Sequence, residues 1–180
     1  MTSPRRTALV VVVEQAEQAV SPWRLRYLRE TVERGIPPHV TILFPFVTAD
    51  ELDTKVLDTL ETVYAGESEF AFSLDRVETF PTHAWLAPEP AEAFLGLIAV
   101  TRACFPSIVP YGDESLYPVP HLTVAGDPDP IRLEQIAEEL REALAPALPL
   151  RASADAIVLL VEQDDRTWVA ERSFRLSRAA

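Results

Sequence analysis

The chain has 180 residues, of which 48% are hydrophobic and 24% are charged, and its formal net charge is −12 at pH 7. These values are typical of a globular protein, and we expect residues 1–180 to form a single domain. The acidic balance argues against non-specific binding to long nucleic acid, but a small anion can still bind where the local charge is positive. A single cysteine excludes an internal disulfide, and no apolar run approaches the length of a membrane span. We therefore expect a soluble, cytoplasmic monomer that binds no membrane.

The first part of the chain predicts a strand, a helix and a second strand. Residues 8–13 form a valine-rich run, which indicates a strand buried on both faces rather than a signal peptide. Ser21 and Pro22 predict the start of a helix, with serine as the N-cap and proline at the first helical position. Gly35 ends this helix, and a strand at residues 39–46 follows.

A second helix is predicted by Thr48 and Glu51, which have the three-residue spacing of a capping box. Gly66 marks its end. The other expected elements are a strand at 70–80, a short strand at 83–87, a helix at 91–105, a proline-rich loop at 105–120, a strand at 121–125, a helix at 131–144 with Asp129 as N-cap, and strands at 150–162 and 167–176 joined by a hairpin turn.

The order of these elements repeats along the chain. Each half runs strand, helix, strand, helix, strand, which suggests two lobes at about residues 7–80 and 81–177. A duplicated unit places equivalent strands around a pseudo-twofold axis. We therefore expect an α+β fold in which two equivalent strands face each other across a cleft.

A short motif that occurs twice is the most informative feature of the sequence. It is Pro-His-Val-Thr-Ile at residues 38–42 and Pro-His-Leu-Thr-Val at residues 120–124, and it uses two of the three histidines. Because successive side chains of a strand point to opposite faces, the histidine and the threonine of each motif share one face. Two such strands can present two imidazoles and two hydroxyls to a common space.

This set of side chains suits the cleavage of a phosphodiester without a metal or a cofactor. One of His39 and His121 can take a proton from the attacking hydroxyl or water while the other gives a proton to the departing oxygen, because histidine titrates near neutral pH. The hydroxyls of Thr41 and Thr123 can donate hydrogen bonds to the non-bridging phosphate oxygens. The sequence leaves open which histidine is the acid and which is the base.

Two other interpretations of the twin motif are open at this point. The histidines could be satisfied core residues of a structural α+β domain, or the motif could bind a nucleotide or phosphate without turning it over. Chance composition rarely produces the motif twice with a preceding proline, and both copies keep histidine and threonine, which favours catalysis. The third histidine, His83, has no threonine partner, and we interpret it as a residue at a strand edge or cleft rim.

Residues around the motifs carry weaker signals. Tyr111 and Tyr117 lie in the proline-rich loop and are candidate substrate-binding residues, because an aromatic ring can stack on a base. Phe44 follows Ile42 by two positions in the predicted strand, so we expect it in the core. The arginines between residues 26 and 34 suit a solvated helix face better than a basic rim.

The twin motif resembles the signature of the two-histidine phosphoesterase superfamily, which is two His-x-Thr/Ser-x motifs with apolar residues at x. The closer resemblance is to its RNA 2′,5′-ligase and 2′,3′-cyclic phosphodiesterase branch, in which a proline-proline-histidine strand such as residues 37–42 follows a helix and a loop. The resemblance implies a bilobal α+β fold with two mostly antiparallel sheets flanking a central cleft and helices on the outside.

The resemblance also implies an activity and a substrate class. It implies metal-independent hydrolysis, or reversible ligation, of 2′,3′-cyclic or 2′,5′-linked nucleotide phosphates in RNA processing. It places His39, Thr41, His121 and Thr123 at the catalytic positions of the family. RNA-active members often carry basic residues around the cleft, whereas this chain is acidic. We therefore expect a small cyclic nucleotide or an RNA-end phosphate, rather than long RNA, as its substrate.

Overall fold

The structure is a computed structural model that describes residues 4–110 and 117–178. Over these residues the chain forms two four-stranded sheets in which all neighbouring strands are antiparallel. The strands of the first sheet are, in spatial order, β2 (His39–Leu43), β1 (Thr7–Val12), β7 (Ala156–Glu162) and β8 (Trp168–Arg175), and those of the second are β5 (Leu122–Gly126), β4 (His83–Glu89), β3 (Phe70–Thr79) and β6 (Leu150–Ala154). The predicted α+β class with two antiparallel sheets is confirmed.

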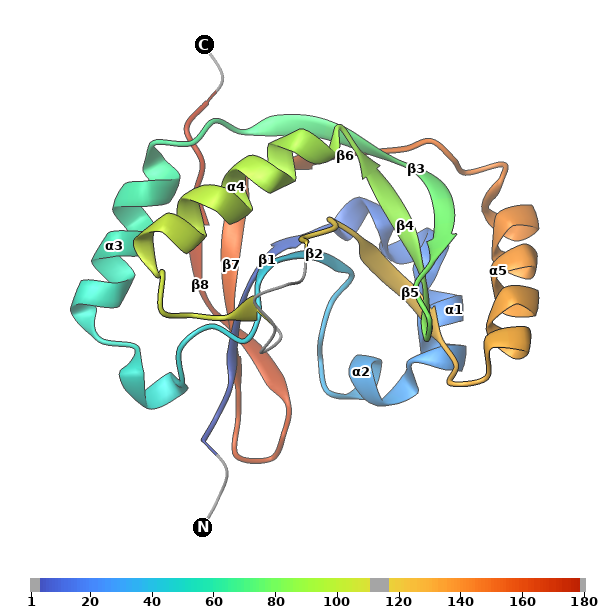
Figure 1. Ribbon diagram of the computed structural model, residues 1–180, viewed down its shortest axis with the longest axis horizontal. Helices are drawn as coiled ribbons and strands as arrows, with labels where there is room; N and C mark the ends of the chain where they lie inside the picture. The colour runs from blue at the N-terminus through green and yellow to red at the C-terminus, as the bar shows by residue number, and fades with distance from the viewer. Residues whose placement is uncertain (1–3, 111–116, 179–180) are drawn as a thin grey trace.

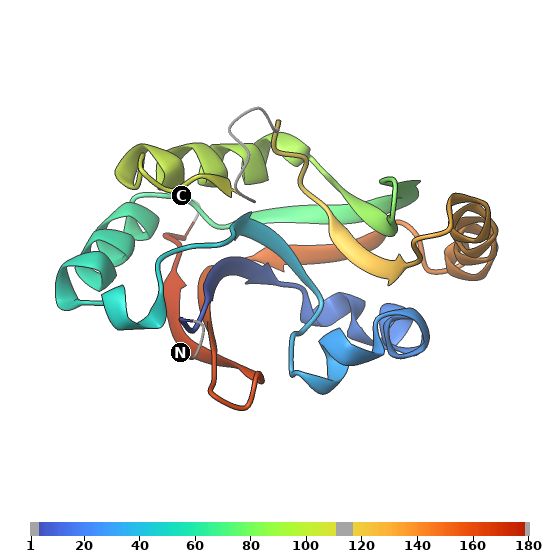
Figure 2. The ribbon, with the colours of Figure 1, turned by 60° about the horizontal axis from the view of Figure 1, so that its bottom comes forward.

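Helices flank the two sheets (Figure 1, Figure 2). Helix α1 lies against β5 and α5 against β3 and β4, whereas α3 lies against β8 and α4 against β2. Their bounds are α1 Glu17–Tyr27, α2 Arg29–Glu33, α3 Thr54–Ala65, α4 Ala91–Cys104 and α5 Pro130–Leu144. In α5, apolar residues at three- and four-residue spacing are buried, so one face of the helix packs on the sheet. Within the described ranges, no helix is both long and apolar enough to cross a membrane.

The two motif strands occupy equivalent places in the two sheets. β2 is an edge strand of the first sheet and β5 is an edge strand of the second. Each pairs with the strand that comes before it in its half of the chain, β2 with β1 and β5 with β4. The two edges also contact each other. The repeat predicted from the element order therefore brings the two motifs side by side.

The lobes expected at residues 7–80 and 81–177 do not coincide with the two sheets. Their boundary falls in the short turn between β3 and β4, which pair with each other in the second sheet. β7 comes from the second half of the chain but pairs with β1 in the first sheet. Each sheet therefore contains strands from both halves. The pairing of β3 with β4 crosses the expected boundary in the second sheet, and the pairing of β7 with β1 crosses it in the first.

The start of the first helix differs from the prediction. α1 begins at Glu17 rather than at Ser21, and Pro22 lies inside it. Ser21 therefore lies inside the helix rather than at its N-cap, and its hydroxyl donates a hydrogen bond to the Glu17 carboxylate one turn earlier. Gly35 follows the short helix α2, with its N–H donating to the Val32 carbonyl at 2.9 Å, and ends the helical segment as predicted.

Two further boundaries differ from the prediction. The carboxylate of Glu51 accepts hydrogen bonds from the N–H and the hydroxyl of Thr48, both at 2.8 Å, but this box caps a single 3₁₀ turn. Helix α3 begins after it, with Asp53 as its N-cap. The strand predicted at 150–162 is two strands, β6 and β7, which separate at Asp155 and join different sheets.

Strand β1 is buried on both faces, as its valine-rich sequence predicts. Its residues Leu9 and Val11 belong to the main hydrophobic core. On the opposite face of the same strand, a smaller buried group consists of Ala8, Val10, Leu160 and Trp168. This second group lines the pocket in which the two motifs meet.

The backbone before the first motif strand, β2, has an unusual conformation at Gly35. It has a φ of +80°, which only glycine adopts without strain, and a Cβ atom there would lie 3.0 Å from the Trp168 carbonyl oxygen. We expect Gly35→Ala to lower the free energy of unfolding by about 1 kcal/mol or more, measured by urea denaturation. The control is Gly96→Ala in helix α4, where a Cβ atom meets nothing within 4 Å. It should raise stability by roughly 0.5–1 kcal/mol. Equal effects at the two positions would show that the backbone at Gly35 imposes no special demand.

Candidate active site

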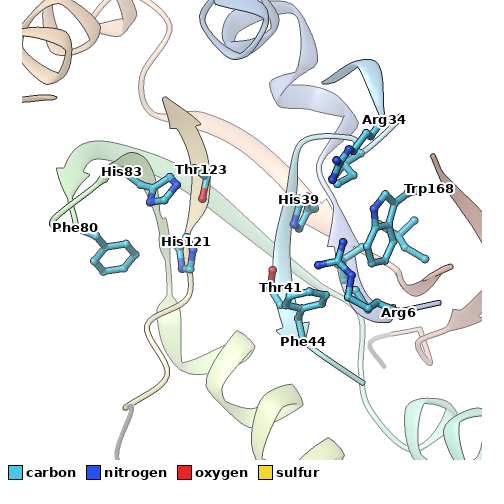
Figure 3. A pocket seen from close by; sticks show the side chains of 14 residues that line it. Arg6, Arg34, His39, Thr41, Phe44, Phe80, His83, His121, Thr123 and Trp168 are labelled. Atoms are coloured by element: carbon cyan, nitrogen blue, oxygen red, sulfur yellow. The ribbon is translucent and has the colours of Figure 1, made fainter. Parts of the chain in front are cut away.

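The two motifs meet in one pocket with a volume of about 510 Å³. His39 and Thr41 reach it from β2, and His121 and Thr123 reach it from the segment that enters and forms β5. Figure 3 shows the two histidine–threonine pairs on opposite sides of the same space. All four residues are partly exposed, whereas the alternating residues Val40, Ile42, Leu122 and Val124 are buried. Strand alternation thus sends the polar side chains to the pocket and the apolar ones to the core.

Both histidines make the same hydrogen bond. Nδ1 of His39 lies 2.7 Å from the carbonyl oxygen of Pro37, and Nδ1 of His121 lies 2.7 Å from that of Val119. A carbonyl oxygen can only accept, so Nδ1 carries the proton in both rings. In its neutral form each imidazole therefore has its lone pair on Nε2. Each ring has one nitrogen held by the backbone and one that is available to a ligand in the pocket.

The prolines of the motifs have a physical role in this arrangement. A proline disfavours helical dihedrals for the residue before it and holds that residue in an extended conformation. In both motifs the residue before the proline is the one whose carbonyl accepts the hydrogen bond from the histidine two positions later. Pro38 and Pro120 therefore help to place the acceptors that orient His39 and His121.

The two threonine hydroxyls are unengaged donors at the pocket wall. Thr41 and Thr123 both line the pocket, and neither hydroxyl has a hydrogen-bond partner in the part of the chain that the structure describes. Each lies on the same face of its strand as the histidine of its motif. A phosphate group between the two strands can therefore receive one hydroxyl hydrogen bond from each side.

His39 is held in its neutral form. Burial lowers the pKa of His39 to about 4, and the neighbouring cations add to this effect, whereas the hydrogen bond to Pro37 opposes it. The first of these cations is Arg24, whose buried guanidinium donates to the carbonyls of Ile36 at 2.9 Å and Pro37 at 3.3 Å. The Pro37 carbonyl thus accepts hydrogen bonds from both Arg24 and His39.

His121 lies in an aromatic environment. Its ring is edge-on to Phe80 at 5.0 Å and to Trp85 at 5.8 Å between centroids, and these two aromatic rings stack on each other at 4.8 Å. Burial lowers the pKa of His121 as well, the hydrogen bond to Val119 opposes the shift, and the nearby His83 adds a small lowering effect. The side chains that surround the two motif histidines differ, so the two rings are not electrostatically equivalent.

His83 lies at the rim of this pocket, in agreement with the sequence interpretation. It is the first residue of β4, it is exposed, and its Nδ1 lies 2.8 Å from the Thr82 hydroxyl. Burial of part of the ring lowers the pKa of His83. The three histidines therefore line one pocket. Within residues 4–110 and 117–178, no group of three His, Cys, Asp or Glu side chains is arranged to hold a metal ion.

The aromatic predictions had different outcomes. Tyr111 lies outside the described residues. Tyr117 is 92% exposed and lines a second, adjoining pocket of about 320 Å³, which shares Thr41 and His121 with the first. Phe44 was expected in the core, but it is partly exposed and lines both pockets. The reason is that β2 ends at Leu43, so strand alternation no longer decides where the next side chain points.

Two pocket residues, Arg6 and Trp168, have no signal in the sequence, and a third, Arg34, belongs to the arginines for which a basic rim was the less favoured interpretation. Arg6 precedes β1, Arg34 follows α2, and Trp168 begins β8, and all three line the pocket (Figure 3). The solvated helix face expected for the arginines of residues 26–34 holds for Arg29, but Arg34 also borders the pocket. The pairing of β1 with β7 and of β7 with β8 brings Arg6 and Trp168 together, and the Trp168 N–H donates to the Arg34 carbonyl at 2.7 Å.

Comparisons with known proteins place this chain among proteins with a common fold. The family model of the 2′-5′ RNA ligase superfamily matches residues 12–166. The structure of E. coli LigT complexed with 3′-AMP is similar, with 14% identity, a TM-score of 0.61, and coverage of 97% of this chain and 99% of that one. LigT complexed with NADP⁺ matches with 14% identity, a TM-score of 0.58 and the same coverage. TT0787 of Thermus thermophilus matches with 19% identity and a TM-score of 0.61, covering 97% of this chain and all of that one. A search of the curated proteins finds no match.

The contacts of the histidines predict their titration. We expect ¹⁵N NMR to find the proton of neutral His39 and His121 on Nδ1, because each Nδ1 donates to a carbonyl. As the pH falls from 7.5, His121 should take up its second proton before His39, whose pKa is lowered to about 4. A neutral His39 with its proton on Nε2, or one that titrates at or above pH 6.5, would contradict the geometry described here.

Proposed function

The chain belongs to the 2′-5′ RNA ligase superfamily, and from this premise we propose that it is a metal-independent phosphodiesterase that opens nucleoside 2′,3′-cyclic phosphates. The observation that supports the proposal most strongly is the matched orientation of the two histidines. Each has Nδ1 bound to a carbonyl and Nε2 available in one pocket, next to an unengaged threonine hydroxyl. This is the set of groups that an in-line displacement at phosphorus requires.

The different environments of the histidines support an assignment of roles. His39, with its pKa lowered to about 4, is neutral over most of the physiological range and is the proposed general base. His121 holds its proton to higher pH and is the proposed general acid. Nε2 of His39 takes a proton from the attacking water while the new P–O bond forms. Nε2 of His121 gives its proton to the ribose oxygen as the cyclic P–O bond breaks.

The threonines are the proposed phosphate ligands. The cyclic phosphate carries one negative charge, shared between two non-bridging oxygens, and charge on these oxygens increases as water attacks. The hydroxyls of Thr41 and Thr123 can each donate a hydrogen bond to one of them. If a ribose 5′-hydroxyl replaces water as the nucleophile, the same four groups open the cyclic phosphate to a 2′,5′ linkage as the bond from phosphorus to the 3′ oxygen breaks and that oxygen takes the proton. Hydrolysis and ligation therefore share one mechanism in this proposal.

The size of the pocket and the ligands of a similar protein support a nucleotide as substrate. A volume of about 510 Å³ lies within the range of small-ligand sites. Structures of LigT, which has the same fold, are described as complexes with 3′-AMP, ATP and NADP⁺. All three compounds are nucleotides with phosphate groups.

The proposal predicts a specific loss of activity. With 2′,3′-cyclic AMP as substrate and a chelator present, His39→Ala and His121→Ala should each lower kcat by roughly 10²- to 10⁴-fold, because each removes a proton-transfer group. Thr41→Val and Thr123→Val should each lower it by roughly ten- to a hundredfold through a lost hydrogen bond to a charged group. The matched control is Thr62→Val, on the exposed face of α3.

Three results would contradict the proposal. Activity that survives in both histidine variants would show that the chemistry occurs elsewhere, and loss of activity with the chelator would show that a metal is required. Binding of 3′-AMP in a calorimetric titration, with no turnover of any cyclic nucleotide, would instead support the alternative of a non-catalytic nucleotide-binding module.

The assigned roles also predict the pH dependence of kcat/KM. The rate should rise as the pH increases through about 4, since the base His39 must lose its proton. It should fall as the pH increases through the pKa of His121, which burial places below the ordinary 6.5, since the acid must keep its proton. The optimum should therefore lie on the acid side of pH 6.5. A rate that still rises above pH 6.5 would overturn the assignment, although not the involvement of the two histidines.

A further inference from the structure

The pocket extends beyond the two motifs to a second end, formed by Arg6, Arg34, Phe44 and Trp168, which we call the arginine end. The lining also includes the apolar residues Ala8, Val10, Ile36 and Leu160, which belong to or pack against the small buried group that contains Trp168. Figure 3 shows Arg6, Arg34 and Trp168 on the far side of His39 from His121. A ligand that fills the pocket therefore meets the polar groups of the motifs on one side, arginines on the other, and an apolar part of the lining.

The charge of the pocket is opposite to that of the chain. Its charged or titratable lining residues, among those the structure describes, are two arginines and three histidines, with no aspartate or glutamate. The chain as a whole has 28 acidic and 16 basic residues. An anion that is repelled by most of the surface is thus attracted to this cavity, because a local field can oppose the net charge.

Arg6 is held rigidly at this end. Its Nε donates to Oε2 of Glu162 at 2.9 Å and its Nη2 donates to Oε1 at 2.8 Å, which is a bidentate pair. The Glu162 side chain is only 5% exposed, whereas that of Arg6 is 44% exposed. The guanidinium also lies over the rings of Trp168 at 5.5 Å and Phe44 at 5.9 Å. These contacts fix the plane of the guanidinium before any ligand binds.

The pair with Glu162 leaves part of the guanidinium free to bind. Nη1 takes no part in the bonds to Glu162, and Figure 3 shows the guanidinium directed toward the side of the pocket where His39 lies. Glu162 also forms an ion pair with Arg166 at 3.6 Å, so this one carboxylate faces two arginines. Arg34 is paired with Glu30, a residue of α2 whose side chain is 78% exposed. Neither carboxylate lines the pocket.

We propose that Arg6, positioned by Glu162, binds a second anionic group of the substrate, so that the preferred substrate is a nucleoside 2′,3′-cyclic phosphate that also carries a 5′-phosphate. This inference rests on the proposed function, because it adds a specificity-determining residue to the same pocket. The cyclic phosphate lies between the two histidines, the uncharged part of the nucleotide contacts the apolar part of the lining, and the 5′-phosphate reaches the arginine end. A guanidinium suits this role because its planar set of N–H donors matches the oxygens of a phosphate.

The experiment compares two substrates in four proteins. The substrates are 2′,3′-cyclic AMP and the same compound with a 5′-phosphate, and the proteins are the unmodified chain, Arg6→Gln, Arg6→Lys and Arg5→Gln. The control Arg5→Gln removes the same charge one residue away, from a side chain that does not line the pocket. In the unmodified chain and in Arg5→Gln, kcat/KM should favour the 5′-phosphorylated substrate by on the order of tenfold or more. The ratio should fall to about one in Arg6→Gln and take an intermediate value in Arg6→Lys.

A binding measurement separates this inference from the proposed function. Adenosine 3′,5′-bisphosphate and 3′-AMP are titrated calorimetrically into the same proteins, and the bisphosphate should bind more tightly only where position 6 carries arginine or lysine. Arg6-dependent binding without turnover would support the second-anion site and contradict the phosphodiesterase. Turnover with no preference for the 5′-phosphorylated substrate, or a preference that Arg6→Gln leaves unchanged, would overturn the second-anion site and leave the phosphodiesterase in place.

The folding of the variants is checked by thermal unfolding. Arg6→Gln alone could unfold because the buried carboxylate of Glu162 loses a partner. In that case the double variant Arg6→Gln/Glu162→Gln, which removes both charges, is tested in place of Arg6→Gln. A preference for the 5′-phosphorylated substrate that persists in the folded double variant would refute the role of Arg6, and loss of the preference there would support it.

Discussion

The hydrogen bond from each motif histidine to the carbonyl two residues earlier is the contact on which the candidate site depends. It decides which nitrogen bears the proton, so it decides which nitrogen a ligand meets. The same contact recurs on both strands at 2.7 Å. It connects a local sequence rule, a proline that constrains the residue before it, to the orientation of a ring in the pocket. The orientation of each imidazole is therefore encoded within three consecutive residues, 37–39 on the first strand and 119–121 on the second.

Much of this fold and the centre of the site could be predicted from the sequence, because the signals are local. Strand alternation places His39 with Thr41, Gly35 ends a helical segment through its positive φ, and the Asp129 carboxylate caps the start of α5 by accepting from the Ile131 N–H. Ser21 and Pro22 show the limit of such signals. They form a good helix start in isolation, but the helix already begins at Glu17, so both residues lie inside it.

What the sequence could not predict depends on pairing between distant segments. Nothing near Asp155 shows that β6 and β7 join different sheets, because the apolar residues continue on both sides of it. The arginine end of the pocket has the same origin. Arg6 and Glu162 are 156 positions apart, and they meet because β1 pairs with β7. Trp168 reaches the pocket through the β7–β8 hairpin. Short motifs thus specify the central chemistry, whereas the topology assembles the surroundings that select a ligand.

The near-equivalence of the two histidine–threonine pairs has a consequence for the regioselectivity of the reaction. A phosphate bound between two similar pairs meets the same kinds of groups if it is turned end for end. The motifs alone therefore do not determine the orientation in which the substrate binds. The orientation is set by the residues that flank the two pairs, which differ. Phe80 and Trp85 lie next to His121, whereas Arg24 and the arginine end lie on the side of His39. Under the proposed mechanism, the difference between the two flanks, rather than the duplicated motifs, determines which ribose oxygen departs and which retains the phosphate.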